Sequence, residues 1–482
     1  MKKFLASIIL AAGVLLAQTA ETIPFRAILL PGNEVPPVAI TASGAATVWL
    51  HVVRDAAGKV TSASTDFNVS YRFPGETRIT GLHIHDGAAG VNGPIRIDSG
   101  ISAATPVPVD STGQGVINRQ GQTLATNTDG LATVSGILTN PSGFYVNLHT
   151  VENPGGVIRG QLMQAESVVL VGLMNPRNEV PPIPDLNASG VGSVVALMTR
   201  GTDGSFNSGQ VIFDLNYTGF PEGTRFTGFH IHDGAAGVNG PVTINTGIQG
   251  GDSALPAQTG GGNLHYEVEV PMSNAAASGT LQGLFRNPAA HYINLHTLVN
   301  PGGAIRSQLR KTDMIRYPVT MLPGNEVPPI TGLDASAPAL VTAHTVRGAD
   351  GSVTAGVVTF DINHRFPGAT TFTGLHIHDG AAGVNGPVTI NSGISSIVSD
   401  TGVGNIYRTV TVSSMAGLAT LNSMVQNPEN QLRQPAHHGE SGWCGTFATV
   451  GSTNQAPYPH IGKSGGICNG INNRRTRRPN QN

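Results

Sequence analysis

Eight histidines recur at matching places along this 482-residue chain and are its main candidates for chemistry. Six of them form pairs separated by one isoleucine: His83/His85, His230/His232 and His376/His378. A further histidine follows the first two pairs at a distance, at His149 and His296. Imidazole is a preferred ligand of Zn²⁺ and Cu²⁺, and three histidines from two neighbouring strands can complete such a site.

The apolar residues around the histidines predict which way the side chains point. Leu82 and Ile84 alternate with the first pair, and Val146 and Leu148 precede His149 in the same alternating manner. Since successive side chains of a strand point to opposite faces, burial of these apolar residues places the histidines on the outer face. The candidate Zn or Cu ligands form two sets: His83, His85 and His149, and His230, His232 and His296. Asp86 and Asp233 directly follow the two pairs.

A purely structural interpretation stays open beside the metal site, because a surface histidine bonded to an acid or amide can simply fix a loop. The chain offers no cysteine ligand, no third carboxylate and no evident general base at these motifs, so we expect no catalytic residues and no enzymatic activity. The alternative is a Cu- or Zn-binding protein or a metalloenzyme that uses the histidine set of each domain. The glycine-rich string that follows each pair lacks the lysine and the helix of a phosphate-binding loop. Its glycines are expected to allow positive φ in a long turn.

The histidine motifs belong to a unit that is repeated three times. Their first histidines are 147 and 146 residues apart, a period of whole domains rather than of a solenoid. Each copy opens with Asn-Glu-Val-Pro-Pro, and the first two close with Asn-Leu-His-Thr, Asn-Pro-Gly-Gly and Ile-Arg-x-Gln-Leu. The predicted domains cover residues 21–166, 167–312 and 313–429.

Composition and periodicity predict an all-β fold for each unit. Gly and Pro number 63 and 32, while charged residues make up 12%, which disfavours helical bundles and coiled coils. Apolar residues alternate with polar ones, as in Phe67, Val69 and Tyr71, which is typical of strands with one buried and one solvated face. We expect three tandem antiparallel β-sandwich or Greek-key-like barrel domains in a row, without an amphipathic helix. The net charge of −2 gives no reason to expect nucleic-acid binding.

The first twenty residues predict export. Lys2 and Lys3 precede an apolar run over residues 4–16 and small residues near Ala20, which is the pattern of a secretory signal peptide over 1–20. The run is too short to span a bilayer comfortably, and no other stretch is as apolar. The expected protein is secreted or extracytoplasmic, in the periplasm or at the cell surface, with no membrane span after signal removal.

The end of the chain departs from the repeat. After Asn427-Pro428, where the closing motif should follow, residues 430–482 read differently and carry both cysteines and an arginine cluster. Back-translated with suitable synonymous codons and read one nucleotide later, they yield NYVNLHTTVNPGGAVRSQL, a closing motif. We therefore expect an aberrant, out-of-frame tail and a truncated third domain. The alternatives are a genuine basic tail or a small loop closed by Cys444 and Cys468.

Together the opening, the His-Ile-His-Asp-Gly-Ala-Ala-Gly-Val-Asn-Gly-Pro string and the closing motif resemble the CHRD domain family, named from the extracellular protein chordin. The resemblance covers residues 22–430 in three copies. It implies a secreted binding or adhesion module without an established enzymatic activity, whose partner we expect to be an unknown extracellular protein or polysaccharide. The His-x-His strand and later histidine are more weakly similar to copper/zinc superoxide dismutase, which implies only a sandwich shape.

Overall fold

The computed structural model describes residues 19–119, 128–380 and 383–426. The predicted signal peptide, apart from Thr19 and Ala20, lies outside these residues, as does the predicted out-of-frame tail with both cysteines. Strand β1 begins at Thr19. No helix among the described residues is long and apolar enough to cross a membrane.

The first unit is a sandwich of two antiparallel sheets, as the alternating pattern predicted. One sheet has the strand order β10-β1-β2-β3-β7 and the other β5-β4-β8-β9, with β6 paired to β4. Phe25, Phe67 and Leu148 lie in the core between them. The strands are β1 (Thr19–Leu29), β2 (Ser43–Arg54), β3 (Val60–Arg72), β4 (Thr77–Asp86), β5 (Ile95–Asp98), β6 (Val107–Val109), β7 (Gln114–Arg119), β8 (Phe144–Thr150), β9 (Ile158–Gln161) and β10 (Met163–Gln164).

The second unit repeats this architecture around its own core. Its sheets have the orders β17-β13-β12-β11-β20 and β15-β14-β18-β19, with β16 paired to β14. The strands are β11 (Glu166–Met174), β12 (Ser189–Arg200), β13 (Phe206–Thr218), β14 (Arg225–Asp233), β15 (Val242–Asn245), β16 (Leu255–Pro256), β17 (Gly261–Val270), β18 (His291–Thr297), β19 (Ile305–Gln308) and β20 (Arg310–Lys311).

Among the described residues, both sheets of the third unit are smaller than those of the other units. Its large sheet has the order β21-β22-β23-β28, without a counterpart of the short edge strands β10 and β20, and β24-β27 and β25-β26 are separate strand pairs. Up to Gln426, no strand takes the place that β8 and β18 hold in the first two units. The strands are β21 (Asp313–Met321), β22 (Ala337–Arg347), β23 (Val353–Arg365), β24 (Thr370–Phe372), β25 (His376–His378), β26 (Val388–Asn391), β27 (Ile397–Ser399) and β28 (Val403–Val412).

The expectation that no copy contains an amphipathic helix is wrong. Each unit has one twelve-residue helix: α1 (Thr128–Thr139), α2 (Ala275–Arg286) and α3 (Met415–Gln426). Leu281 and Leu284 of α2 are fully buried, and the helix packs on β13 of one sheet and β15 of the other. The Gly, Ser and Thr content of these segments lowers helix propensity, so tertiary packing of a short apolar face decides the structure.

A glycine in the sheet makes room for this helix. A Cβ atom on Gly209 of β13 would lie 2.0 Å from the Leu281 side chain. In the third unit, a Cβ atom on Gly356 of β23 would likewise lie 2.3 Å from the Leu421 side chain of α3.

Short 3₁₀ turns complete the connections between the strands. Five of them begin with a proline: η1 (Pro31–Asn33), η2 (Pro141–Gly143), η3 (Pro176–Asn178), η5 (Pro288–Ala290) and η6 (Pro323–Asn325). The sixth, η4 (Gly251–Ser253), begins with a glycine.

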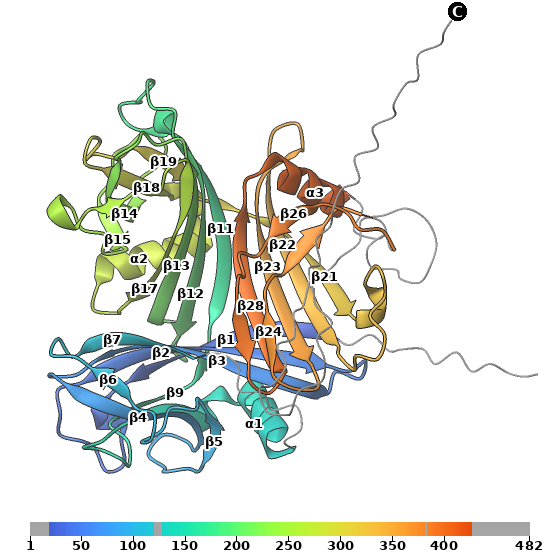
Figure 1. Cartoon of the computed structure of the whole chain (residues 1–482). Coiled ribbons are helices and arrows are strands. Elements are labelled where there is room, and N and C mark those ends of the chain that lie inside the picture. The colour runs from blue at the N-terminus through green and yellow to red at the C-terminus, as the bar shows by residue number, and fades with distance from the viewer. Residues whose placement is uncertain (1–18, 120–127, 381–382, 427–482) are drawn as a thin grey trace, which may run out of the picture.

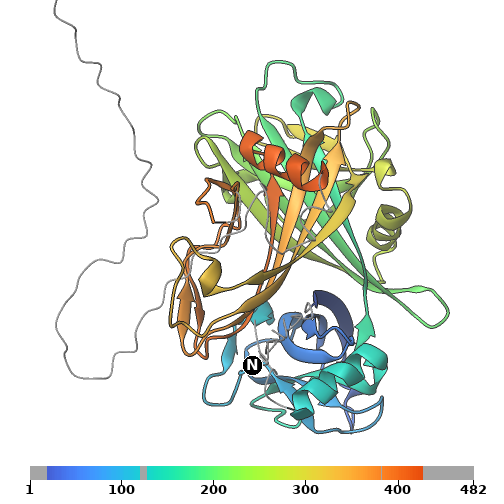
Figure 2. The ribbon, with the colours of Figure 1, turned by 90° about the vertical axis from the view of Figure 1, so that its right-hand side faces the viewer.

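The three units are packed around a common centre rather than arranged in a row. Figures 1 and 2 show the three large sheets facing one another, with the helices on the outer sides of their units. Polar side chains join the sheets: Thr47 donates to Gln210 at 3.0 Å, and Asn216 donates to the Thr411 carbonyl at 2.8 Å. Along the central strands β2, β12 and β22 the predicted solvated face is therefore buried, which corrects the expectation of one wet face, whereas outer strands such as β21 keep exposed residues.

Candidate functional site

Two strands of the smaller sheet bring the predicted histidines together in each of the first two units. Strand β4 carries His83 and His85, and neighbouring β8 carries His149 opposite Gly81. Leu82 and Leu148 are buried in the sandwich core, so the histidines occupy the other face, as the alternation predicted. Strands β14 and β18 arrange His230, His232 and His296 in the same way.

A glycine two residues before the first histidine creates the space for the imidazole rings. Gly81 lies on the same face as His83, and a Cβ atom there would come within 2.6 Å of that ring and 3.1 Å of His149. In the second unit, a Cβ atom on Gly228 would lie 2.3 Å from the ring of His230. Any side chain at these positions would displace the rings.

The histidines of the first unit are buried rather than exposed at the surface, and two of them are bonded to loops. His83, His85 and His149 are only 9, 7 and 8% exposed. The carbonyl of Gly93, at the end of the glycine-rich loop, accepts from Nδ1 of His85 at 3.0 Å, and Pro154 of the turn after β8 does so for His149. Gly90 in that loop has φ +82°, the positive value that the glycine-rich string predicted.

These backbone contacts decide which nitrogen faces the site. A carbonyl oxygen only accepts, so Nδ1 of His85 and of His149 must carry the proton, and the neutral rings present a lone pair at Nε2. In the second unit, His232 and His296 donate in the same way to Gly240 and Pro301, both at 3.0 Å. Metal-bound histidines are usually fixed by such a bond from their second nitrogen.

The first histidine of each set, His83 or His230, is turned the other way. Nε2 of His83 lies 3.6 Å from the Asp98 carboxylate, on the paired strand β5, so its Nδ1 faces the site. Asn245 takes the place of Asp98 beside His230. Within the described residues, the atoms that face each other are buried and lack a hydrogen-bond partner in the first unit: Nδ1 of His83 and Nε2 of His85 and His149.

The spacing of these nitrogens fits a metal ion. In each set the potential ligand atoms all lie within 4.8 Å of one another. Nε2 of His232 and Nε2 of His296 are 3.4 Å apart. Tetrahedral zinc with Zn–N bonds of about 2.0–2.1 Å requires ligand nitrogens about 3.3 Å apart. Two lone pairs at this distance repel each other unless a proton or a cation lies between them.

The environment keeps the imidazoles neutral, the state that a metal ligand needs. Burial is the main cause that lowers the pKa of His83 and His85, and it lowers the pKa of His149 to about 4. In the second unit burial, with the neighbouring histidines, lowers the pKa of His230 to about 4. At neutral pH each site therefore offers three unprotonated nitrogens.

The acidic residues after each pair do not join these sets. Asp86 is half-exposed and lies 3.4 Å from Arg96, and Asp233 lies 3.5 Å from His291. The third unit places His376 and His378 on β25, where Nδ1 of His376 and Nε2 of His378 are buried without a hydrogen-bond partner, but no third histidine joins them among the described residues.

A layer of motif residues that the sequence reasoning did not assign supports each site. Tyr145 stacks on His85 with ring centroids 4.8 Å apart, and the Arg159 guanidinium lies 4.5 Å from the same phenol ring. Arg159 also donates to Asn92 at 2.8 Å, which in turn donates to the Val35 carbonyl at 2.7 Å. The opening, middle and closing motifs thus meet around one ligand ring.

The glutamate of the opening motif is buried in this layer. Glu34 is 5% exposed, and its Oε2 lies 3.9 Å from Arg159. Burial raises the pKa of Glu34 to about 7, against the opposing effects of Arg159 and Asn147. Glu179 repeats this environment in the second unit, with its pKa raised to about 7 as well. Repetition of all these residue types in both copies was the signal that could have identified them.

The repeated sandwich and its buried histidines define a class of tandem all-β domains built from three shared motifs. The CHRD domain model matches residues 25–162 and 171–309, and the chain belongs to the CHRD domain family. These ranges contain both histidine sets and their supporting layers. The third unit lies outside the matched ranges, so its membership remains a prediction. No curated protein sequence matches the chain.

Proposed function

We propose that this protein is a non-catalytic binding protein whose first two units each hold one Zn²⁺ or Cu²⁺ ion through three histidines. The observation that carries this proposal is the convergence of three neutral imidazole nitrogens in each unit. Family membership supports a binding module rather than an enzyme. The cationic ligand would relieve the repulsion between His232 and His296 and stabilise the folded state.

Two features support a structural or carrier role for the ion over catalysis. The second ring nitrogen of each histidine in the first unit is engaged by a carbonyl or carboxylate, so no ring nitrogen is free to act as a general base once the ion occupies the first one. The buried position also restricts the approach of a substrate. In the extracytoplasmic location that the signal peptide predicts, such a module would present a stable binding surface to extracellular proteins or polysaccharides.

Elemental analysis of protein purified without a polyhistidine tag tests the proposal. We expect two Zn or Cu ions per chain, one lost in His85→Ala, one lost in His232→Ala and both lost in the double variant. His265→Ala is the matched control, because this histidine is half-exposed and lies outside both sets. Failure to take up Zn²⁺ or Cu²⁺, or unchanged stoichiometry in the double variant, would overturn it.

A further inference from the structure

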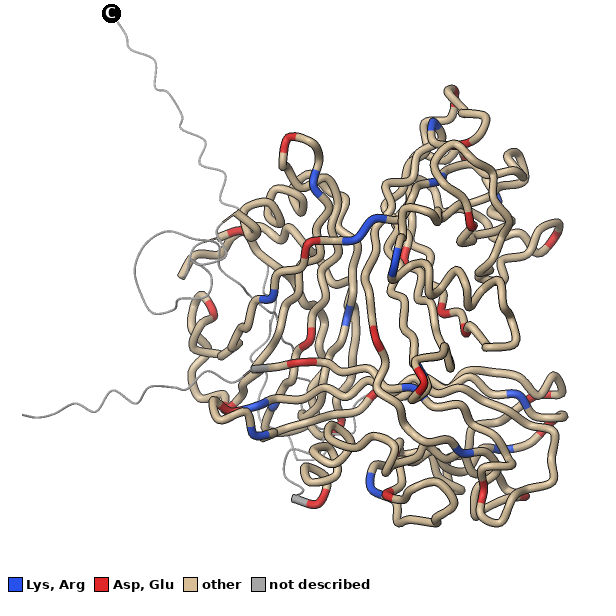
Figure 3. The backbone as a smooth tube through the Cα atoms, turned by 180° about the vertical axis from the view of Figure 1, so that it is seen from behind, with Lys and Arg blue, Asp and Glu red and all other residues tan. Residues whose placement is uncertain are grey.

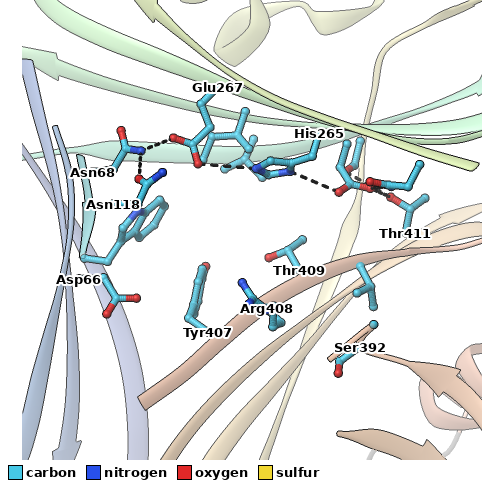
Figure 4. Close-up of a pocket in the computed structure, with 18 of the residues that line it drawn as sticks. Asp66, Asn68, Asn118, His265, Glu267, Ser392, Tyr407, Arg408, Thr409 and Thr411 are labelled. Carbon is cyan, nitrogen blue, oxygen red and sulfur yellow. Dashed lines mark hydrogen bonds and ion pairs between the residues drawn. The ribbon is translucent and has the colours of Figure 1, made fainter. Parts of the chain in front are cut away.

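A cavity of about 710 Å³ lies where the three units meet, away from the histidine sites. It is lined from all three large sheets, by residues of β2, β3 and β7 in the first unit, β12, β13 and β17 in the second, and β28 in the third. Figure 4 shows side chains from the three units pointing into this space. Its volume is in the range of ligand pockets, which often form between domains.

Charges in the cavity nearly balance. His265 lies between two carboxylates, with Nδ1 3.5 Å from Asp214 and Nε2 3.6 Å from Glu267. Hydrogen bonds to these two acids raise the pKa of His265 to about 9, so it is cationic at neutral pH. The remaining charged lining residues are Asp66, Arg119 and Arg408, which gives three acids and three bases in all. The lining therefore has no net charge that would favour a polyanion or a strongly cationic ligand.

The cavity also combines an aromatic pair with amide groups. Trp49 of β2 and Tyr407 of β28 both line it, and their rings stack at 5.4 Å across the first and third units. Asn68, which donates to Asn118 and to Glu267, lines the first-unit side. Asn263 of the second unit donates to Asp214 at 3.0 Å and to Asn216 at 2.9 Å.

This combination matches the chemistry of sugars. A pyranose ring has apolar C–H faces that pack on aromatic rings, whereas each hydroxyl both donates and accepts hydrogen bonds. Asparagine amides likewise offer donors and acceptors, and carboxylates fixed by ion pairs add further acceptors. Figure 3 shows charges of both signs scattered over the three units, and the described residues form no basic tract for an anionic polysaccharide.

We propose that the central cavity binds a neutral oligosaccharide. The ligand lies between the three units, so it contacts all of them and stabilises their packing. Single units cannot form this site, because each contributes only one wall. The proposal does not rest on metal binding, since no lining residue belongs to a histidine set.

Tryptophan fluorescence tests the proposal directly. Trp49 and Trp443 are the two tryptophans of the chain, so Trp443→Phe leaves Trp49 as the sole reporter. The full chain is titrated with cellohexaose, chitohexaose, laminarihexaose and mannohexaose at up to millimolar concentration. We expect at least one to give a saturable change in emission, and heparin to give none.

Variants on two walls then locate the site. Asn118→Ala in the first unit and Asn263→Ala in the second should each weaken binding about tenfold, the effect of losing one or two hydrogen bonds. Gln249→Ala is the control, because this exposed amide does not line the cavity. No response to any of the four sugars, or equal affinity in the asparagine variants, would overturn the proposal.

Discussion

The phenol ring of Tyr292 is stacked on the imidazole of His232, with centroids 4.6 Å apart and planes inclined by 11°. The Arg306 guanidinium lies 4.1 Å from the centroid of the same phenol ring. The imidazole and the guanidinium are too close to the phenol ring to share one of its faces, so they pack on opposite faces of Tyr292. The hydroxyl of Tyr292 accepts from the Gly240 amide at 3.1 Å, next to the carbonyl that binds His232. Tyr292 thus orients His232 in two ways: it packs on the ring, and it holds the loop residue Gly240 to which the ring is bonded.

Replacement of Tyr292 by leucine should weaken metal binding in the second unit. Loss of the stacked ring frees His232 to rotate, and loss of such outer-shell support typically costs about 10–100-fold in metal affinity. Competition with a chromophoric chelator measures the affinity, with the first site removed by His85→Ala. Tyr292→Phe keeps the stacked ring and should lose less affinity than leucine does. Equal affinity in all three proteins would show that Tyr292 has no positioning role.

The third unit should be the least stable of the three and should bind no metal. In the first unit β8 fills the position beside β4 with the buried side chains of Val146 and Leu148. Loss of two large aliphatic side chains alone costs on the order of 4–8 kcal/mol. Thermal unfolding with unit-specific proteolysis should therefore show the third unit opening first.

The gene decides the origin of this deficit. If the nucleotides after the codon for Pro428, read one position over, encode the closing motif, restoring that frame should raise the melting temperature of the third unit. It should also raise the metal content from two to three ions per chain, because His376 and His378 gain a third ligand. If they encode no such motif, the tail over 430–482 is a genuine part of the chain.

The two-residue period of apolar side chains was sufficient to predict the sandwich, because residues such as Phe67 and Val69 alternate strictly with polar ones. It could not predict that the opposite faces would be covered, since Thr47 and Asn68 look like solvated residues until a second unit is placed against them. The helices escaped detection for a related reason. Leu281 and Leu284 form a short apolar face in a Gly/Ser/Thr-rich segment, and the sheet glycine that receives the helix lies about seventy residues away.

The histidine sets were predictable because strand alternation fixes which side chains share a face. Burial of His85 was not, because the covering contacts come from Gly93 in a loop and from Arg159 behind Tyr145. Asp86 directly follows His85 in the sequence, but it does not join the site. Its position at the strand end instead directs it to solvent and Arg96.

A buried histidine makes the contact between the first and third units sensitive to pH. His51 has Nε2 3.3 Å from Asp66 and Nδ1 3.7 Å from Asp361 of the third unit. Burial is the largest effect and opposes the charge, but the hydrogen bond and charge of Asp66, with Asp361, raise the pKa of His51 above its usual 6.5. Protonated His51 therefore contributes stability that is complete below about pH 6.5 and is lost as pH rises through the folded-state pKa.

Replacement of His51 by glutamine should consequently destabilise the protein more at pH 6 than at pH 9. Urea unfolding at both pH values gives the difference in free energy of unfolding between the parent and the variant. Asp361→Asn should reduce the same pH dependence, because it removes one of the two charges that favour the imidazolium. A difference between parent and variant that is constant over this range would contradict the charged contact.

Arg26 and Glu269 link the first and second units, and replacement of one should destabilise the protein more than replacement of the other. Its side chain is 1% exposed, donates to Thr47 at 2.5 Å and is bonded to Glu269, whose side chain is 26% exposed. Removal of the Glu269 charge leaves a buried guanidinium without its counter-ion, which costs about 3–5 kcal/mol in buried pairs. Removal of Arg26 leaves a carboxylate that water can reach, so Arg26→Met should be less destabilising than Glu269→Leu.

Urea unfolding of the two single variants and the double variant measures this difference. The free energy of unfolding of the double variant should be closer to that of Arg26→Met than to that of Glu269→Leu. If the two single variants lose equal stability, or neither loses any, the pair does not hold the units together as described.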